Sequence, residues 1–367
     1  MDGAPAETEK KSVIVVDGAP RRGGYTSELT DLFCQGVLES GGEPVRVALS
    51  ERDIRPCRGC WRCWEPGRAG RCVQRDDMGE ILDLYLEAGA LVLASPVYFF
   101  SLSAVSKTFV ERLYPLLAPR RGAPEHRKRG PDRAVLIAVQ GHRDAELMDS
   151  LVRTFELTSR ALGLAPAGVL LRPESHMLDF SMTSSPVVDR SVRAAFLSAG
   201  RQLALDGRVS PETERAASRP LCRDDALFES HTEAYWEIAA ESEVPYSDRE
   251  RLRQAVADDL RLLVPDLASS MDAKAAAGLE AVVLIDPGAG PDKRWHLVVS
   301  GGRCTAARGD HPSPDLALEA DDRTFREILS GRTDAKRAMS AGSLRWRGDD
   351  DLATRLWRLF PRGGRSR

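Results

Sequence analysis

The N-terminal part of the chain alternates apolar runs with segments whose apolar residues recur at helical spacing. The runs at 13–16, 90–94, 134–139 and 167–171 are nearly continuous, whereas 44–49 alternates between apolar and polar positions. Continuous runs are typical of strands that are buried on both faces of a sheet. Helical spacing fits the intervening segments, for example 78–87 and 103–113. The pattern predicts an α/β fold, a doubly wound parallel sheet of five strands.

From about residue 185 the pattern becomes helical and more polar, with prolines at 211, 220 and 245. One apolar face recurs along 192–203 and predicts a helix that closes the first domain. Ser210 followed by Pro211 is typical of the start of another helix. We therefore expect a first domain over 12–240, including the closing helix and a helical connector.

The pattern changes again after residue 250. Strands are expected at 281–285, 295–299, 303–307, 316–320 and around 344–346, with helical faces at 325–329 and 352–359. Successive strands followed by helices predict a smaller α+β unit over 250–362.

Composition narrows the functional classes. The 367 residues are 42% hydrophobic and 29% charged, as in an ordinary soluble protein. A net charge of −3 with scattered arginines argues against nucleic acid as a partner. No apolar run is long enough to span a bilayer, and residues 1–11 lack the apolar core of a signal peptide. We expect a cytoplasmic protein.

A glycine-rich segment between the first apolar run and the following helix has the order strand, turn, helix. Such a turn directs backbone N–H groups and a helix N-terminus at one point, which favours an anion. The spacing matches neither a nucleoside triphosphate loop nor a dinucleotide fingerprint. A single phosphomonoester, as on FMN, fits better, although an ordinary turn rich in small residues is the alternative. The candidate phosphate-binding residues are Pro20, Arg21, Arg22, Gly24, Thr26 and Ser27.

Two more loops follow the runs at 90–94 and 134–139. Ligands of such sheets bind beyond the carboxyl ends of the strands, so both loops are candidates to frame a flat ring. Aromatic side chains in the first could flank the ring, and a histidine in the second could hydrogen-bond it or donate a proton. Core packing of the aromatics and a solvated histidine are the alternatives. The candidates are Ser95, Pro96, Val97, Tyr98 and Phe99 in the first loop and Gln140, Gly141 and His142 in the second.

Four of the seven cysteines lie within sixteen residues. Thiolates at this spacing can hold a 4Fe-4S cluster or, with less suitable spacing, a zinc ion. The alternatives are reduced cysteines that line a pocket and a redox-active thiol pair. Trp61 and Trp64 would then form part of a hydrophobic substrate wall. The candidate ligands are Cys57, Cys60, Cys63 and Cys72.

The loops together resemble the NADPH-dependent FMN reductase family of the flavodoxin-like fold. Its members carry a Gly-Ser-Pro-Arg loop with a downstream Thr or Ser, and a Ser-Pro-x-Tyr loop; here these are residues 18–21 and 95–98. The resemblance implies non-covalent FMN, reduction by NADH or NADPH, and a homodimer with flavin at the subunit interface. Ala19 departs from the usual serine. Phe100 stands where a small residue is common, and we expect it to contact the substrate.

The cysteine segment is similar to the iron–sulfur flavoprotein branch of that family, which has a tighter gap before its fourth cysteine. Residues 250–362 resemble the sterol carrier protein type 2 domain, on the order of elements from 282–285 to 348–349. That resemblance implies an apolar tunnel for lipid or acyl chains. A packing or dimerisation module with a filled core is the alternative.

Three functional hypotheses follow. The first is an FMN-dependent NAD(P)H oxidoreductase that transfers hydride through the flavin to a quinone, nitro, azo or other conjugated lipophilic acceptor. The second is an electron carrier with FMN and a 4Fe-4S cluster. The third is a non-enzymatic carrier of hydrophobic ligands on a degenerate flavodoxin-like scaffold, which the departures at Ala19 and Phe100 keep open.

Overall fold

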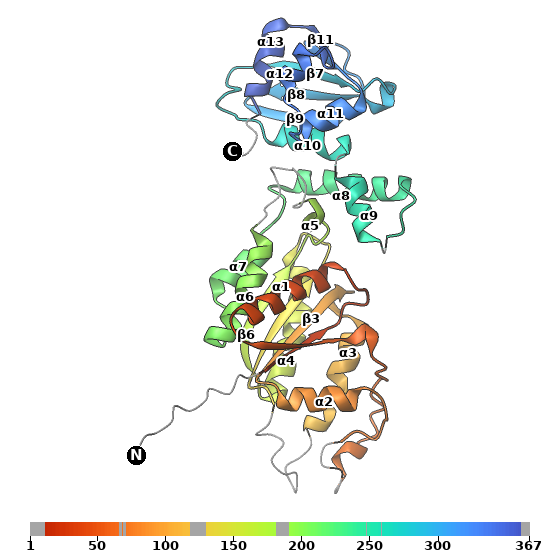
Figure 1. Cartoon of the computed structure of the whole chain (residues 1–367), viewed down its shortest axis with the longest axis vertical. Coiled ribbons are helices and arrows are strands. Elements are labelled where there is room, and N and C mark those ends of the chain that lie inside the picture. Colours follow the sequence, from red (N-terminus) through yellow and green to blue (C-terminus); the bar gives the residue numbers. More distant parts are fainter. Residues whose placement is uncertain are drawn as a thin grey trace, which may run out of the picture. The chain divides into compact units, whose positions relative to one another are not determined.

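The computed structural model describes residues 12–65, 68, 71–117, 130–180, 191–246, 248–257 and 259–360 (Figure 1). Two compact units make up the chain. One comprises residues 1–175 and 190–220, and the other comprises residues 176–189 and 221–367. Our division of the chain at residues 240–250 remains a prediction about its folding units.

The main sheet of the first unit is parallel, as predicted. Its strands lie in the order β2-β1-β3-β5-β6. A two-residue strand, β4 (Ser101–Leu102), pairs antiparallel with the end of β3 and was not predicted. The parallel strands are β1 (Ser12–Asp17), β2 (Glu43–Ala48), β3 (Ala90–Tyr98), β5 (Arg133–Val139) and β6 (Ala165–Arg172).

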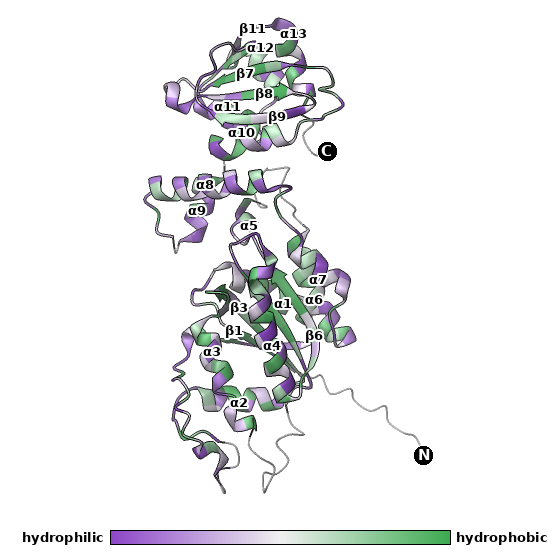
Figure 2. Ribbon diagram, turned by 180° about the vertical axis from the view of Figure 1, so that it is seen from behind, coloured by the Kyte–Doolittle hydropathy of each residue, from purple (hydrophilic) through white to green (hydrophobic). Residues whose placement is uncertain are grey.

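Helices cover both faces of this sheet, so the doubly wound α/β prediction is confirmed (Figures 1 and 2). Apolar residues of α2, α3 and α4 share a core with alternate residues of the strands. Helices α1 and α6 cross closely on the other face, where a Cβ on Gly36 would lie 2.0 Å from the Leu197 carbonyl oxygen. The helices are α1 (Tyr25–Glu39), α2 (Met78–Glu87), α3 (Ala104–Glu111), α4 (Asp149–Leu162), α6 (Val192–Asp206) and α7 (Pro211–Ser218).

The second unit begins with helices and continues into a mixed sheet. Its helical part comprises α5 (Met177–Phe180), α8 (Asp225–Glu241), α9 (Arg249–Val256) and α10 (Leu260–Ser269). The sheet has the order β11-β10-β7-β8-β9, in which only β10 and β7 pair in parallel. Its strands are β7 (Ala281–Asp286), β8 (Trp295–Ser300), β9 (Arg303–Arg308), β10 (Leu316–Glu319) and β11 (Arg345–Gly348).

Every second residue of β7, β8 and β10 is buried, and these residues share one core with the helices of the unit. This one-sided pattern confirms the predicted α+β unit. The remaining helices are α11 (Asp322–Leu329), α12 (Ala335–Ser340) and α13 (Asp350–Arg355). Among the described residues, no helix is both long and apolar enough to cross a bilayer.

Candidate functional site

The glycine-rich loop between β1 and α1 leaves the first turn of the helix open. Gly24 precedes the helix, and no side chain caps its first N–H groups. The first helical hydrogen bond runs from the Glu28 N–H to the Gly24 carbonyl oxygen at 3.0 Å. The N–H groups of Thr26 and Ser27 therefore have no partner within the helix and lie at the positive end of its dipole, although both residues are largely buried. This geometry suits a phosphate.

The base of the loop is fixed to β3 and α3. The Gly18 N–H donates to the Ala94 carbonyl oxygen at 2.8 Å, and the Ser103 hydroxyl donates to the Gly18 carbonyl oxygen at 2.9 Å. A Cβ on Gly18 would lie 1.7 Å from the Ser106 hydroxyl oxygen and 3.1 Å from the Ala94 carbonyl oxygen, so a larger residue here would displace the Ser106 hydroxyl. The loop after β1 and the loop after β3 thus form one bonded unit.

A buried carboxylate at the end of β1 escaped the sequence analysis. Asp17, 2% exposed, accepts hydrogen bonds from the Ala19 N–H and the Ser27 hydroxyl, both at 2.9 Å. Arg46 of β2 donates to the same carboxylate at 2.5 Å and to the Ser27 oxygen at 2.9 Å. The hydroxyl hydrogen of Ser27 is engaged by Asp17, so its backbone N–H is the group left for a phosphate. Thr26 is the hydroxyl donor that remains.

The charges around Asp17 stabilise one another. Burial alone would lower the pKa of Arg46, but its bond to Asp17 and the charges of Asp17 and Asp31 outweigh that effect and raise it. Arg46 also pairs with Asp31 of α1. A signal was present in the sequence: arginine sits between Val45 and Val47 in an apolar strand. The sequence alone does not identify Asp17 as its partner, because the parallel register that sets Arg46 beside Val15 of β1 comes from the fold.

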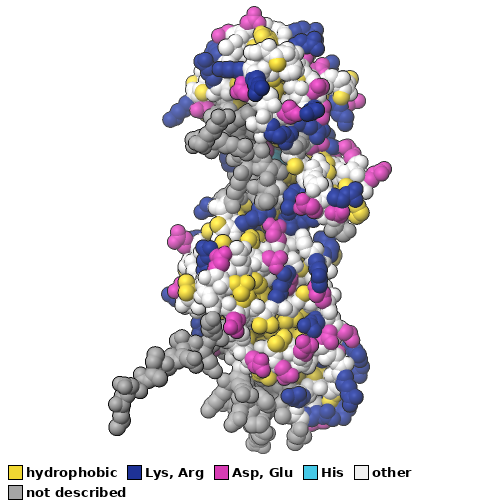
Figure 3. Space-filling view, in the orientation of Figure 1, with side chains coloured by type: hydrophobic (Ala, Val, Ile, Leu, Met, Phe, Trp, Pro, Cys, Tyr) yellow, Lys and Arg dark blue, Asp and Glu magenta, His cyan; other side chains and the backbone are white. Residues whose placement is uncertain are grey.

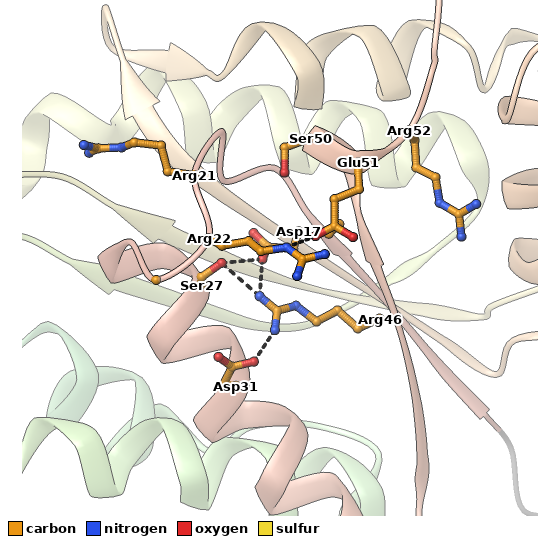
Figure 4. A pocket seen from close by; sticks show the side chains of 11 residues that line it. Asp17, Arg21, Arg22, Ser27, Asp31, Arg46, Ser50, Glu51 and Arg52 are labelled. Carbon is orange, nitrogen blue, oxygen red and sulfur yellow. Dashed lines mark hydrogen bonds and ion pairs between the residues drawn. The ribbon is translucent and has the colours of Figure 1, made fainter. Parts of the chain in front are cut away.

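A pocket of about 660 Å³ opens beside this loop, on the side of β2 (Figure 4). Arg46 reaches from β2 toward Ser27 and Asp31 of α1, and Arg22 lies next to Glu51, whereas Arg21 points away from this cluster. The lining residues are Asp17, Arg21, Arg22, Gly23, Ser27, Asp31, Arg46, Ala48, Ser50, Glu51 and Arg52.

The loop after β3 has an inner and an outer part. Ser95 is buried; its hydroxyl donates to the Pro96 carbonyl oxygen at 2.8 Å and accepts the Ser103 N–H at 3.0 Å. Ser95 therefore has a structural role at the base of the loop. The strand continues past Pro96 and Val97, and the chain then turns back into β4 at two aromatic residues.

These aromatic side chains are not in the core. Tyr98 is 47% exposed, Phe99 98% and Phe100 51%, and both phenylalanines have left-handed backbones with φ of 48° and 62°. A bulky residue with a left-handed backbone conformation costs about 1–3 kcal/mol, and such residues cluster at functional sites. Hydrophobic side chains gather on the face of the first unit that Figure 3 shows, among interspersed acidic and basic ones.

The loop after β5 is tied to the chain that follows β6. Gln140 is buried, and its side-chain amide donates to the Asp144 carbonyl oxygen at 2.5 Å. The His142 carbonyl oxygen accepts the Glu174 N–H at 2.9 Å. Gly141 and His142 are exposed. Because β3 and β5 are paired up to Pro96 and Val139, this loop starts beside the loop after β3. The candidate ring-framing residues thus share one sheet edge.

The four-cysteine segment does not form a metal centre in this structure. Cys60 is exposed, and Cys57, Cys63 and Cys72 are partly buried. Over the described residues, which include all four, no group of three or more Cys, His, Asp or Glu side chains is placed to hold a metal ion. Burial and the neighbouring Cys72 raise the pKa of the Cys63 thiol. The assignment of these four cysteines as ligands of a 4Fe-4S cluster stays a prediction.

A buried ion pair anchors this segment. Arg112, at the end of α3, donates to both carboxylate oxygens of Asp76, at 2.5 and 2.9 Å, and to the Arg55 carbonyl oxygen at 2.7 Å. Both side chains are inaccessible to solvent. Trp61 and Trp64 pack edge to face at 4.6 Å between ring centroids, and the Trp64 indole donates to the Tyr114 carbonyl oxygen. The two rings form a partly exposed aromatic pair, and their role in a substrate wall stays a prediction.

Residues 12–150 match the family model for NADPH-dependent FMN reductase, and residues 263–361 match the SCP-2 sterol transfer family. The iron-sulfur flavoprotein of Archaeoglobus fulgidus is 41% identical over 98 residues, which are 27% of this chain and 43% of the relative. Iron-sulfur flavoprotein MJ1083 of Methanocaldococcus jannaschii is 38% identical over 104 residues, 28% of this chain and 52% of the relative. The chain thus spans about half the length of these curated relatives.

Among solved structures, the NAD(P)H:quinone oxidoreductase from Methanothermobacter marburgensis aligns with a TM-score of 0.39 at 19% identity, over 53% of this chain and 96% of that one. Azoreductase AzrA aligns with a TM-score of 0.38 at 15% identity, over 53% of this chain and 99% of the azoreductase chain. The two family matches and the two sheets agree on the organisation of the molecule. The chain thus carries a segment that matches the NADPH-dependent FMN reductase family model, followed by a segment that matches the SCP-2 sterol transfer family model.

Proposed function

We propose that this protein is an FMN-dependent NAD(P)H oxidoreductase that reduces a conjugated, lipophilic acceptor such as a quinone, nitro or azo compound. One observation carries the proposal: the uncapped first turn of α1 follows a loop that Gly18 holds rigidly to β3 and α3. Preorganised N–H groups at a helix N-terminus suit the phosphate of FMN. The match to the reductase family supports the same conclusion.

The roles of the residues follow from their positions. The N–H groups of Thr26 and Ser27 and the Thr26 hydroxyl would bind the phosphate, and Arg22 adds positive charge. Flavin, when bound, accepts hydride from a nicotinamide and passes it on. Tyr98 and Phe99 would contact the ring, and the exposed loop at Gly141–His142 would close the opposite edge.

The exposed aromatic side chains also support the expected partners. Tyr98, Phe99 and Phe100 present apolar surface at the same sheet edge, which favours a lipophilic substrate and a second copy of the chain. The SCP-2-type domain is consistent with an apolar substrate. Homodimerisation and a cytoplasmic location remain proposals.

Thr26→Val tests the phosphate site, with Thr30→Val as the matched control. The Thr30 hydroxyl is buried and bonds to the Thr26 carbonyl oxygen one turn along α1, away from the open end of the helix. We expect Thr26→Val to weaken FMN binding about tenfold, the effect of roughly one lost hydrogen bond to a charged group, and to leave riboflavin binding unchanged. Thr30→Val should change neither. A purified protein that is colourless and remains so after FMN is added would overturn the proposal.

An iron–sulfur flavoprotein that carries electrons is the second candidate. The 41% identity to a relative of that name and the four-cysteine segment favour it, and the dispersed thiols argue against it. Anaerobic purification followed by iron and sulfide analysis decides between them. Four irons per chain, lost in Cys57→Ser, would establish this candidate, and iron near zero would remove it.

A further inference from the structure

Arginines are concentrated on the segment that carries the four cysteines. Between residues 55 and 75 the chain has six arginines and a single carboxylate, Glu65, although the net charge of all 367 residues is −3. The six side chains are all exposed: Arg55, Arg58, Arg62, Arg68, Arg71 and Arg75. This segment is therefore strongly positive on a chain that is acidic elsewhere.

These arginines are only loosely paired with carboxylates. The nitrogen–oxygen separations are 3.7 Å for Arg55–Asp53, 3.9 Å for Arg62–Glu65, 3.6 Å for Arg68–Glu65 and 4.0 Å for Arg71–Asp83. Each separation exceeds the usual length of a hydrogen bond, and exposed pairs of this kind contribute little free energy. An anion outside the chain can therefore replace these carboxylates at little cost.

The two ends of the segment lie side by side on a fixed base. The Gln74 side-chain amide donates to the Pro56 carbonyl oxygen at 3.1 Å, and Arg55 donates to the Arg75 carbonyl oxygen at 3.3 Å. The buried Arg112 holds the Arg55 carbonyl oxygen at 2.7 Å. Basic side chains gather along the lower right edge of the first unit in Figure 3, where the ribbon of Figure 1 places this segment.

Exposed aromatic rings lie among these arginines. Trp61 is 54% exposed and Tyr114 39%, with 5.6 Å between their ring centroids. Trp61 also has a left-handed backbone, with φ of 59°, and its ring packs against Trp64. Such strain is typical of functional positions, and an aromatic ring with one polar edge suits the boundary between water and lipid. We call the six arginines together with Trp61, Trp64 and Tyr114 the basic aromatic patch.

We propose that the basic aromatic patch binds the surface of an anionic lipid bilayer. Arginine is attracted to negatively charged headgroups, and tryptophan is favoured at the depth of those headgroups. Single-stranded nucleic acid is bound along a positively charged groove, whereas this segment projects from the first unit as a loop beside α2 (Figures 1 and 2). A projecting loop fits a flat surface. This binding is peripheral and needs no cofactor, so it does not depend on the proposed function.

Sedimentation of the full-length protein with vesicles tests the charge of the patch. The vesicles contain phosphatidylcholine alone or phosphatidylcholine mixed with phosphatidylglycerol. Arg58→Gln with Arg71→Gln removes two cations of the patch, and Arg153→Gln with Arg323→Gln removes two exposed cations elsewhere, so the net charge is the same. We expect binding only to the vesicles with phosphatidylglycerol, and weaker binding as salt is added. The patch variant should bind about tenfold more weakly, and the control should bind like the parent protein.

Tryptophan fluorescence tests whether the rings enter the lipid, because brominated phosphatidylcholine quenches tryptophans that contact acyl chains. Trp61→Asn replaces the exposed ring with a residue that tolerates a left-handed backbone. Trp236→Asn, on α8 and 50% exposed, is the matched control. We expect brominated lipid in the anionic vesicles to quench the parent protein and the control. Trp61→Asn should lose most of this quenching and bind more weakly.

Several results would overturn the proposal. These are no binding to anionic vesicles, equal binding to both kinds of vesicle, binding that neither patch variant weakens, and binding without quenching. Selective binding of RNA or polyglutamate, with no binding to vesicles, would assign the patch to an anionic polymer instead. A change of oligomeric state in Trp61→Asn, with no vesicle binding by the parent protein, would assign it to a subunit interface. Failure of FMN to bind concerns the proposed function alone.

Discussion

The two sheets of this molecule are built on opposite plans. In the first unit β1, β3 and β5 are buried almost without interruption, whereas in the second unit β7, β8 and β10 bury every second residue. A sheet covered on both faces exposes mainly its edges and ends. Its polar chemistry is therefore concentrated where the strands end, and the candidate site lies there. The second sheet keeps one face free of the main core.

The largest expected difference concerns buried charge. Arg112→Leu leaves the inaccessible Asp76 carboxylate unpaired and should cost about 3–5 kcal/mol. Arg294→Leu in the second unit breaks a pair whose side chains are 31% and 15% exposed and should cost about 1 kcal/mol or less. Hydrogen–deuterium exchange with mass spectrometry reports each unit separately. Equal losses in the two units would contradict the comparison.

A second test uses the helix crossing that covers one face of the first sheet. A Cβ on Gly200 would lie 2.0 Å from the Phe33 carbonyl oxygen, so Gly200→Ala forces α1 and α6 apart and should cost about 3 kcal/mol. Gly79 in α2 has open space around it, and Gly79→Ala should stabilise by about 0.5–1 kcal/mol. Urea unfolding measures both. A tolerated Gly200→Ala would show that the close crossing is not needed.

Truncating one leucine in each sheet compares how strongly the two sheets depend on buried side chains. Leu136 in β5 is fully buried, and Leu136→Ala should cost about 3 kcal/mol. Leu284 in β7 belongs to the partly exposed face, and Leu284→Ala should cost less than about 1.5 kcal/mol. Hydrogen-exchange rates of backbone amides within each sheet give the two losses of stability. A larger loss for Leu284 would mean that the second face is covered in solution.

The smallest effect is a pH dependence. Burial would raise the pKa of Asp76, but hydrogen bonds from Arg112 and from backbone N–H groups outweigh it, and the pKa is lowered from 3.8. The contribution of the pair is therefore complete above about pH 4 and is lost as the pH falls through the lowered pKa. In Asp76→Asn the free energy of unfolding of the first unit should fall less steeply between pH 5 and pH 2. Hydrogen-exchange protection, measured as the pH is lowered, gives this slope. An unchanged slope would assign the acid sensitivity to other carboxylates.

The sequence predicted the fold because continuous and alternating apolar runs directly reflect burial on two faces or one. Strand bounds shifted by a few residues: β3 runs on to Tyr98, past Pro96, because its end pairs with the short β4. That hairpin escaped prediction because Phe99 and Phe100 are unusual residues for positive φ.

The candidate site was predicted only in part. The loops were placed correctly at adjacent strand ends, but Ser27 and Ser95 have hydroxyls engaged in internal bonds. Asp17 and Arg46 were missed because their interaction depends on the pairing of β1 with β2. The cysteine spacing did not reveal how the thiols are arranged, since Arg112 from another helix holds the chain on both sides of the segment, at Arg55 and at Asp76.

The hydroxyl of Ser103 gives the molecule a constraint for engineering. It caps α3 and also bonds the Gly18 carbonyl oxygen, while the Ser103 N–H bonds Ser95. Any redesign of residues 99–103 to admit a bulkier acceptor would shift this serine. Under the proposed function, cofactor retention would change together with acceptor preference, and libraries that vary this hairpin need to be screened for both properties at once.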